Sequence, residues 1–358
     1  MSVMRILYVD FNTTGHHSVY FRTISLIELI EPILVLPKRA DEVDVRQYEI
    51  SCLSRNMNLF QYKKVIREIN AIIEKENPDI VHILSGDMLY RFFGYQLNRI
   101  KSPLIVTFHH MKFSFSKSIS YRMIYRNIYC GVVHTEFIYQ KLKNLGVSNA
   151  YHIEYPFLET IKSYNKKLLK KQFSIPDNRK VFLAFGETRY DKGLDFLLKA
   201  LANIKEPFHL IIAGQPTEIA KEDIKRLTED YKDKTTLILS YIDNETMCKI
   251  FAMSDTVVLP YRKKFAGASG PLTTAVAYGK MIIGPNINSI GDIIRRYHLG
   301  VTFDCENQKS LENSLKSSLL TEFKYDDYAK DYQAIISRDK FIENYKKVYM
   351  LRGKLIYK

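Results

Sequence analysis

Short apolar runs alternate with amphipathic stretches along the first half of the chain. The runs predict strands at Arg5–Val9, Ile33–Leu36, Ile80–Leu84, Leu104–Phe108, Gly131–Thr135 and Ala150–Glu154. The amphipathic stretches predict helices at about Val19–Ile30, at Asn58–Glu76, and at Glu136–Leu145 before a C-capping Gly146. Strands that alternate with helices are typical of a parallel sheet, so the first half is predicted to be a doubly wound α/β domain.

The same alternation continues through the second half. Strands are predicted at Val181–Phe185, His209–Ala213, Thr236–Leu239, Thr256–Leu259 and Met281–Ile283. Helices are predicted at Gly193–Leu201, near Glu218–Asp230, and at Asn244–Met253, Leu272–Tyr278, Lys309–Leu319 and Tyr325–Tyr349. Between the halves, Tyr155–Lys180 holds Pro156, Pro176 and several lysines, which places a linker there.

Length and composition fit two domains that each bury a core. The chain has 358 residues and the composition of a soluble globular protein. Met1–Asp10 leads straight into a strand rather than forming a signal peptide, and no apolar run is long enough to span a bilayer, so we expect a cytoplasmic protein. The four cysteines have no metal-ligand spacing, which argues against disulfides and a structural zinc site.

The net charge of +14 favours anionic partners, and its distribution sharpens this expectation. No Asp or Glu occurs between Asp87 and Glu136, where the cations are Arg91, Arg99, Lys101, Lys112, Lys117, Arg122 and Arg126. They are interleaved with Phe113, Phe115, Ile119, Tyr121, Met123, Ile124 and Tyr125. This pattern suits peripheral contact with an anionic membrane, or equally a core of aromatic residues with a solvated basic rim. No known nucleic-acid-binding motif accompanies the charge, so nucleic acid is not expected as a partner.

Two loops of the second half have the chemistry of an anion site. The loop after Val181–Phe185 brings Arg189 and Lys192, whose fork and point charge suit a diphosphate, although a basic pair in a loop is often only solvated surface. The loop after Thr256–Leu259 brings Ser269 and Gly270 to a helix start, where backbone N–H groups and the helix dipole favour an anion. A tightly packed βαβ crossover is the alternative for that second loop.

Four blocks of the second half resemble a known family. They are FGETRYDKGLDFLLKAL, HLIIAGQP, SYIDNETMCKIFAMSDTVVLPY and SGPLTTAVAYGKMIIGPNINSIGDII. In order and spacing they are similar to the donor-binding half of GT-B glycosyltransferases of family 4. The first half resembles this family more faintly, through MRILYVDFNTTGHHS, PDIVHILSGD, PLIVTFHH and GVVHTEFIYQKLKNLGV.

The resemblance implies two Rossmann-like domains that face a cleft. Residues 1–160 would be the acceptor-binding domain, residues 161–325 the donor-binding domain, and residues 326–358 a final helix that crosses back onto the first domain. Phe341, Tyr345 and Val348 form an apolar stripe suited to that crossing, or equally to ordinary packing.

The resemblance also implies particular site residues. Gly15 would face the donor phosphates, with His16 and His17 either on the acceptor side or simply on the loop surface. His109, in a Thr107-Phe108-His109 sequence like the T-x-H of the family, would lie near the sugar; without the resemblance it reads as a capped residue at a strand end. His110 stands where the family often has an acid. Tyr241 and Ile242 would lie against the nucleotide base. The remaining expected donor contacts are Gly186, Ser269, Gly270, Pro271 and Thr274.

One departure from the family pattern is specific. Many members carry two glutamates eight residues apart, and alignment places these positions at Ala266 and Thr274. Thr274 offers a single hydroxyl in place of a carboxylate that could grip the ribose. The chain instead matches the variant of the family that has Ser-Gly before the helix, here Ser269-Gly270.

The sequence therefore predicts transfer of a sugar from a UDP- or GDP-linked donor to a hydroxyl of a glycan or lipid-linked acceptor. The resemblance implies retention of anomeric configuration and no metal or other cofactor. Arg189 and Lys192 would stabilise the departing diphosphate. The alternatives are a nucleotide-sugar epimerase, for which Asp10 and Asp87 are the candidate carboxylates, and a non-catalytic partner subunit.

Overall fold

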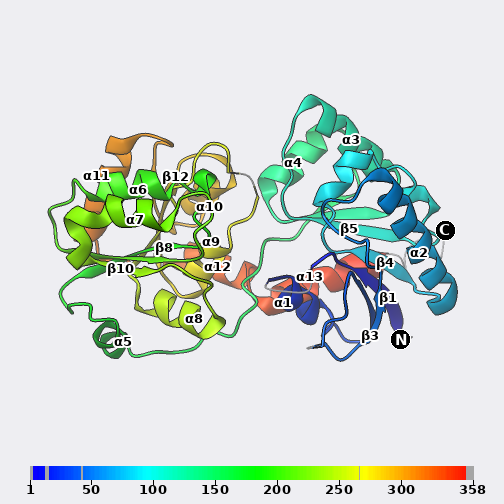
Figure 1. Cartoon of the computed structure of the whole chain (residues 1–358), viewed down its shortest axis with the longest axis horizontal. Coiled ribbons are helices and arrows are strands. Elements are labelled where there is room, and N and C mark those ends of the chain that lie inside the picture. Colours follow the sequence, from blue (N-terminus) through cyan, green and yellow to red (C-terminus); the bar gives the residue numbers. More distant parts are fainter. Residues whose placement is uncertain (1–2, 13–15, 42, 266, 352–358) are drawn as a thin grey trace. The chain divides into compact units, whose positions relative to one another are not determined.

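The chain forms two compact units. The computed structural model describes residues 3–12, 16–41, 43–265 and 267–351, without the side chain of His16. The first unit comprises the described parts of Met1–Glu159, Ala266–Ala268 and Arg338–Lys358, and the second comprises Thr160–Phe265 and Ser269–Ser337. Apart from the short segment Ala266–Ala268, the chain thus leaves the first unit after Glu159 and returns to it at Arg338, whereas the sequence placed boundaries after residues 160 and 325 (Figure 1).

The first unit is built on a parallel sheet. Its strands are β1 (Met4–Val9), β2 (Ile30–Leu36), β3 (Arg46–Glu49), β4 (Ile80–Ile83), β5 (Leu104–Phe108), β6 (Cys130–Val133) and β7 (Ala150–His152). They lie in the order β3-β2-β1-β4-β5-β6-β7, and every pair is parallel. The strand order reverses between β1 and β4, which makes the carboxyl ends of these two strands the expected ligand position.

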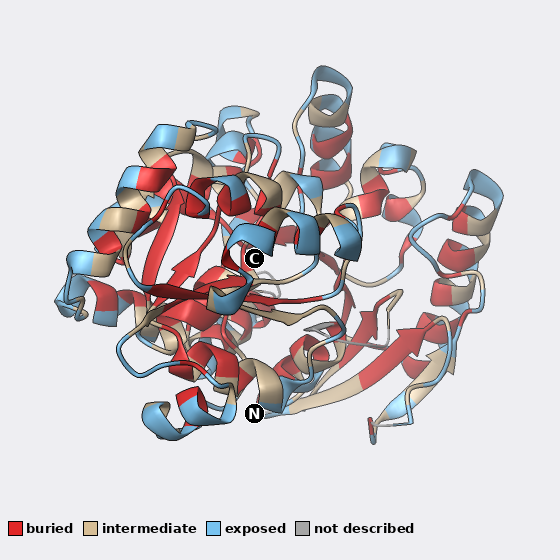
Figure 2. Ribbon diagram, turned by 60° about the vertical axis from the view of Figure 1, so that its left-hand side comes forward, coloured by how far each residue is buried: buried red, intermediate tan, exposed pale blue. Residues whose placement is uncertain are grey.

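Helices cover both faces of this sheet. They are α1 (His16–Ile24), α2 (Leu59–Glu76), α3 (Phe115–Arg126), α4 (Glu136–Asn144) and α13 (Arg338–Met350), with 3-10 turns η1 (Asp87–Phe92) and η2 (Leu97–Arg99). Asn58 begins α2 with a capping box, in which its side chain accepts from Gln61 N and Gln61 Oε1 accepts from Asn58 N. The inner faces of the helices are buried and their outer faces exposed (Figure 2).

The second unit repeats the architecture. Its strands are β8 (Lys180–Phe185), β9 (Phe208–Ala213), β10 (Thr235–Ile238), β11 (Thr256–Val258), β12 (Met281–Pro285) and β13 (Gly300–Phe303). They are parallel throughout, in the order β10-β9-β8-β11-β12-β13. The reversal here falls between β8 and β11. The expected doubly wound sheets are therefore confirmed in both units.

The helices of the second unit connect these strands. They are α5 (Lys166–Gln172), α6 (Leu194–Leu201), α7 (Lys221–Thr228), α8 (Asn244–Met253), α9 (Gly270–Ala277), α10 (Asn288–Arg296), α11 (Gln308–Leu320) and α12 (Asp327–Ile335), with 3-10 turns η3 (Tyr190–Lys192) and η4 (Glu229–Lys234). Across the described residues, no helix combines the length and apolar character that crossing a membrane requires. All four cysteines are free thiols.

The prediction of a helix that continues to Ile30 was wrong. Helix α1 ends at Ile24, and Leu29 turns the chain with a φ of 64°. Ile30 then pairs with Met4, so β2 begins three residues before the predicted Ile33. Pro32 fits within this strand because β3 pairs only with the part of β2 that follows it, which leaves one edge of β2 open at the proline.

Other local predictions were also wrong. Strand β3 was not predicted, because it is an edge strand whose residues form no apolar run. Helix α3 lies in the basic segment that was not assigned to any element, and α10 and β13 were not predicted either. The predicted closing helix at Tyr325–Tyr349 is two helices, α12 and α13, which belong to different units.

Candidate functional site

The loop after β8 closely approaches the loop after β9, next to the switch point between β8 and β11. Gly186 N donates to Ala213 O at 2.8 Å, and a Cβ on Gly214 would collide with the Gly186 carbonyl. Gly186 has a φ of 112°, which other residues rarely adopt. The glycines therefore allow the two strand ends to bring backbone groups together at the carboxyl edge of the sheet.

Lys192 lies directly above Gly186. A Cβ on Gly186 would be 2.6 Å from Lys192 Nζ, so the absence of a side chain makes room for the ammonium group. Burial lowers the pKa of Lys192, and the nearby charge of Arg189 lowers it further, while Glu187 and Asp191 raise it. Its Nζ forms no hydrogen bond or ion pair with any residue that the structure describes. A half-buried cation in this situation is suited to an anionic ligand.

Arg189 is already engaged by a carboxylate. Its Nε and Nη2 donate to the two oxygens of Asp191 at 3.0 and 2.9 Å, and this bond raises the Arg189 pKa. The guanidinium group that we predicted to bind a diphosphate thus binds Asp191. Three of its five N–H groups remain for another ligand. Arg189 contributes charge next to Lys192, but with its orientation set from within its own loop.

Arg262 fixes this loop against the loop that follows β11. Its Nη2 donates to both Asp195 oxygens at 2.8 and 2.7 Å, and its Nε donates to Tyr190 O at 3.0 Å. Gly193, with a φ of 65°, lies so close to the Pro260 carbonyl that a Cβ there would collide with it. The sequence showed only a basic loop at this point, so this positioning role of Arg262 was missed.

Tyr261 connects the cationic loop to the start of α9. Its hydroxyl forms a hydrogen bond of 3.0 Å with Ser269 Oγ. Burial raises the pKa of Tyr261 to about 12, while the bond to Ser269 and the charge of Arg189 oppose that rise, so Arg189 acts on the same hydroxyl. Ser269 is the N-cap of α9, with Oγ accepting from Leu272 N at 3.3 Å, and Pro271 stands in the first turn.

The Thr274 hydroxyl points back into its own helix. It donates to Gly270 O at 2.9 Å, and the residue is buried. Its hydrogen is therefore committed, and only its oxygen lone pairs remain for a ligand. Thr274 in this position does not replace the carboxylate that many members of the resembled family carry. Ala266, the other glutamate position, lies outside the described residues.

A small pocket lies where β8 and β11 end. The described residues that line it are Ala184, Phe185, Gly186, Glu187, Thr188, Lys192, Leu194, Ile212, Val258, Pro260 and Tyr261. Gly186 and Lys192 thus belong to the pocket itself, and Ser269 reaches it through Tyr261. Tyr241 is 75% exposed and, with Ile242, follows β10 at the edge of the sheet, away from this lining.

The switch point of the first unit holds a buried histidine and aspartate. Asp10 follows β1 and its Oδ2 lies 2.9 Å from His17 Nδ1, while Arg55 Nη2 donates to His17 Nε2 at 3.1 Å. Since arginine can only donate, Nε2 is the acceptor in the contact with Arg55, and Nδ1 is the ring nitrogen that faces Asp10. Ser85, which follows β4, lies 3.4 Å from the same Nδ1. Gly15, the predicted phosphate contact of this loop, lies outside the described residues.

His109 lies beside this cluster at the end of β5. Its Nε2 donates to Leu84 O at 2.8 Å, and burial is the main cause that lowers its pKa, so its ring is neutral. Asp87 Oδ1 accepts from the backbone N–H groups of both His109 and His110, at 2.9 and 2.8 Å. The sequence did not show that Asp87 orients this strand end. The carboxylates of Asp10 and Asp87 are thus committed to local bonds, which does not favour an epimerase.

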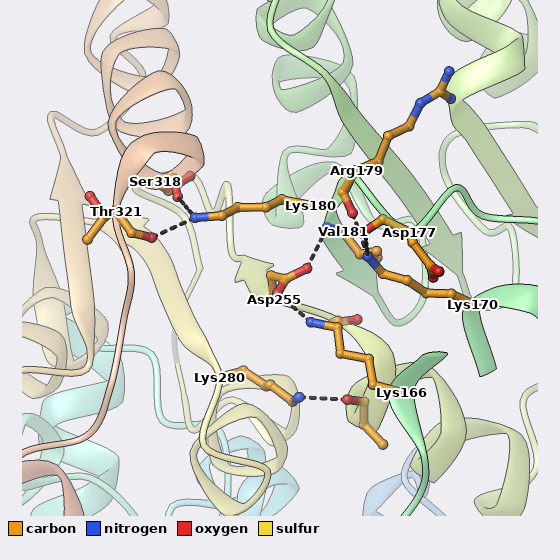
Figure 3. Close-up of polar contacts among 12 residues, drawn as sticks. Lys166, Lys170, Asp177, Arg179, Lys180, Val181, Asp255, Lys280, Ser318 and Thr321 are labelled. Carbon is orange, nitrogen blue, oxygen red and sulfur yellow. Dashed lines mark hydrogen bonds and ion pairs between the residues drawn. The ribbon is translucent and has the colours of Figure 1, made fainter. Parts of the chain in front are cut away.

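A second group of cations lies at the opposite, amino edge of the sheet of the second unit (Figure 3). Lys170 donates to the carbonyls of Asp177 and Arg179, Lys180 to those of Ser318 and Thr321, and Lys280 to that of Ala252. Lys166 forms an ion pair with Asp255, whose other oxygen accepts from Val181 N. These lysines mainly satisfy carbonyls where helices and turns end, so we assign them a structural role.

The roles of the predicted site residues remain predictions. The structure brings Gly186, Lys192 and Arg189 together, and connects them to Ser269 through Tyr261. His109 lies in the first unit, in a different cluster. Among the described residues, no three His, Cys, Asp or Glu side chains are grouped in a way that could hold a metal ion.

Comparison with known sequences identifies a related family. A family model described as "Glycosyl transferases group 1" matches residues 165–347, more than half of the chain. An uncharacterised glycosyltransferase of Methanocaldococcus jannaschii is 23% identical over 157 residues, which cover 42% of this chain. The match spans 38% of the length of that relative.

Solved structures resemble nearly the whole chain. The sucrose-phosphate synthase of Thermosynechococcus elongatus matches with a TM-score of 0.76 at 14% identity, over 98% of this chain and 100% of that one. The Anabaena protein HepE, solved in complex with UDP, matches with a TM-score of 0.77 at 14% identity, over 96% of this chain and 99% of that one. At these identities the likeness shows the fold, and it confirms the expected GT-B class of two Rossmann-like α/β domains.

Proposed function

The chain belongs to the family of glycosyl transferases group 1, and from this membership we propose that it transfers a sugar from a UDP- or GDP-linked donor to an acceptor hydroxyl. The acceptor class that we propose is a glycan or lipid-linked sugar of a surface polysaccharide or glycolipid. We assign donor binding to the second unit and acceptor binding to the first. That HepE was solved with UDP supports a nucleotide-sugar donor.

The observation that carries this proposal is the position of Lys192. Its ammonium lies over Gly186 at the switch point, partly desolvated, with Arg189 close enough to lower its pKa. A diphosphate bound here would meet Lys192 Nζ, the remaining N–H groups of Arg189 and the amino end of α9 at Ser269. Such groups are worth more in a water-excluded pocket than in water, and they need no reorganisation as charge develops.

In the proposed reaction the bond between the anomeric carbon and the diphosphate breaks first. Negative charge then grows on the departing oxygen, and Lys192 and Arg189 stabilise it more strongly than they stabilise the ground state. The same diphosphate oxygen takes the proton of the acceptor hydroxyl, and the new bond forms on the face that the diphosphate leaves, with retention of configuration. This route uses no carboxylate base and no metal. His109 remains the candidate sugar contact of the first unit.

Calorimetry with UDP and GDP tests the anion site directly. We expect one nucleotide to bind the wild type, and Lys192→Ala to weaken that affinity by about 10- to 100-fold, since a charge-assisted contact is removed. Lys199→Ala is the matched control, because Lys199 is an exposed lysine of α6 and the charge change is the same. Equal affinities for the two variants would refute the assignment of the diphosphate to Lys192.

Incubation with single nucleotide sugars then separates the possible activities. Slow release of the nucleotide and free sugar, with the anomer read by NMR before mutarotation, identifies a transferase and its stereochemistry. An altered sugar still attached to its nucleotide would identify an epimerase. Absence of binding to every donor would favour a non-catalytic partner subunit.

A further inference from the structure

Helix α3 of the first unit exposes an apolar ridge. Phe115, Ile119 and Met123 follow one another at intervals of four residues, which places them on one side of the helix. They are 85%, 38% and 40% exposed. The opposite side of α3 packs on the sheet through Tyr121, Ile124 and Tyr125, which are buried, so the ridge is not needed to hold the helix in place.

The exposed face of α3 is also basic. Lys112, Arg122 and Arg126 are exposed around the ridge. Arg122 donates its Nε–H to Leu145 O at 2.9 Å, and none of these three forms an ion pair with a described residue. No acidic residue occurs between Asp87 and Glu136, so α3 itself carries only positive charges.

Neighbouring side chains extend the apolar surface. Gly94 packs so closely on α3 that a Cβ there would lie 3.1 Å from Ile124 Cα and 3.2 Å from the Met123 carbonyl carbon. The residues on either side of this glycine, Phe93 and Tyr95, are 42% and 46% exposed. The described side chains Phe93, Tyr95, Phe115, Ile119 and Met123 therefore form an apolar surface, which we call the α3 ridge.

We propose that the α3 ridge inserts into the interface of an anionic lipid bilayer and that the cations around it contact the lipid headgroups. A helix with apolar residues flanked by Lys and Arg binds such an interface by burying its side chains among acyl chains, while headgroup charge attracts its cations. A nucleic acid would satisfy the cations but would leave Ile119 and Met123 in water. A second copy of the chain would bring two uncompensated positive surfaces together, at an electrostatic cost.

This inference rests on the proposed function in one respect only, namely that a lipid-linked acceptor is itself in a membrane. Binding to lipid alone needs neither donor nor acceptor. A failure to bind vesicles would therefore leave the nucleotide measurements unaffected, and a failure to bind nucleotide would leave the vesicle result standing.

Flotation of the whole chain with vesicles is the test. We expect binding to phosphatidylcholine vesicles that contain phosphatidylglycerol, little binding to phosphatidylcholine alone, and weaker binding as salt is raised. The variant Phe115→Ala, Ile119→Ala, Met123→Ala should lose about tenfold or more in affinity, because the buried apolar contact is removed. Leu168→Ala is the control for this change, since Leu168 is 65% exposed on lysine-rich α5 of the second unit.

A charge variant tests the second half of the proposal and remains informative if the triple variant does not fold. Lys112→Gln with Arg126→Gln should weaken binding to anionic vesicles and reduce its salt dependence, whereas Lys199→Gln with Lys225→Gln should do neither. Equal binding by the wild type and the α3 variants would overturn the proposal. So would equal binding to neutral vesicles, or a wild-type dimer without lipid that the triple variant converts to a monomer.

Discussion

At the scale of single residues, the pocket of the second unit depends on where glycine allows a charge to lie. Lys192 occupies space above Gly186 that a side chain would fill, and Gly193 lets its loop contact the Pro260 carbonyl. The sequence made Arg189 and Lys192 visible as a basic pair after a strand. It did not reveal that Asp191 would bind the Arg189 fork, because that contact depends on the turn of the backbone between them.

Gly186→Ala should disturb the pocket more than the fold. The new Cβ would displace Lys192 Nζ, and the strained φ of 112° should cost about 1–3 kcal/mol of stability. We expect weaker binding of UDP or GDP by calorimetry. Gly279→Ala is the control, because Gly279 has a φ of 64° with open space around its Cβ position. It should lose about 1 kcal/mol in a urea melt and keep its nucleotide affinity. Full nucleotide affinity in Gly186→Ala would show that the position of Lys192 Nζ over Gly186 is not needed for nucleotide binding.

Lys280 should make stability depend on pH in the alkaline range. Burial lowers its pKa from 10.5 to about 8, so the unfolded chain binds more protons between these values. The unfolding free energy therefore rises with pH from about 8 to 10.5, and the stability gained in this range is lost again as pH falls towards 8. Lys280→Met should remove a rise in unfolding free energy of up to about 3 kcal/mol across this window, measured by urea melts at several pH values. Lys199→Met, at an exposed position, should leave that slope unchanged.

At the scale of elements, α13 is held by a buried polar network rather than by apolar contact alone. Tyr349 OH lies 2.8 Å from His82 Nδ1, and Tyr345 OH lies 2.8 Å from Thr107 Oγ1, which in turn lies 2.8 Å from His82 Nε2. Tyr345 also forms a hydrogen bond with Tyr20 of α1. The predicted stripe of Phe341, Tyr345 and Val348 is buried as part of this contact.

Acid should loosen α13. Burial lowers the pKa of His82 from 6.5 to about 3, so its contribution to stability is present above pH 6.5 and is lost as pH falls towards 3. We expect hydrogen-exchange protection of α13, corrected for intrinsic rates, to decrease over this range. Tyr349→Phe should lower that protection at neutral pH by about 0.5–1.5 kcal/mol, because one hydrogen bond to His82 is lost. Tyr328→Phe, at an exposed tyrosine of α12, should have no effect on α13.

The elements that the sequence predicted well are those with one dominant signal. Parallel strands buried on both faces appear as apolar runs, and α2 has both a capping box and a long periodic pattern. Helix α3 was missed because its exposed apolar residues blur the contrast between its two faces. Strand β3 was missed because pairing with β2, rather than burial, defines it.

At the scale of the whole molecule, we propose that each unit binds a different ligand: the second unit binds the nucleotide, and α3 of the first unit binds lipid. We expect UDP or GDP to increase hydrogen-exchange protection at residues 186–193 and 269–274, with no change in α3. Anionic vesicles should protect α3 and leave residues 186–193 unchanged. Protection of α3 by nucleotide alone would contradict this division. Neutral vesicles and inorganic phosphate at matched concentration provide the controls.

The return of α13 to the first unit has a consequence for biosynthesis. The side chains that complete the N-terminal core, among them Tyr345 and Tyr349, follow the second unit in the chain and are therefore synthesised after it. All of the second unit emerges before them, and domains generally fold as units during translation. The half of the protein that is made first must therefore wait, incompletely assembled, until the half that is made second has already had time to fold.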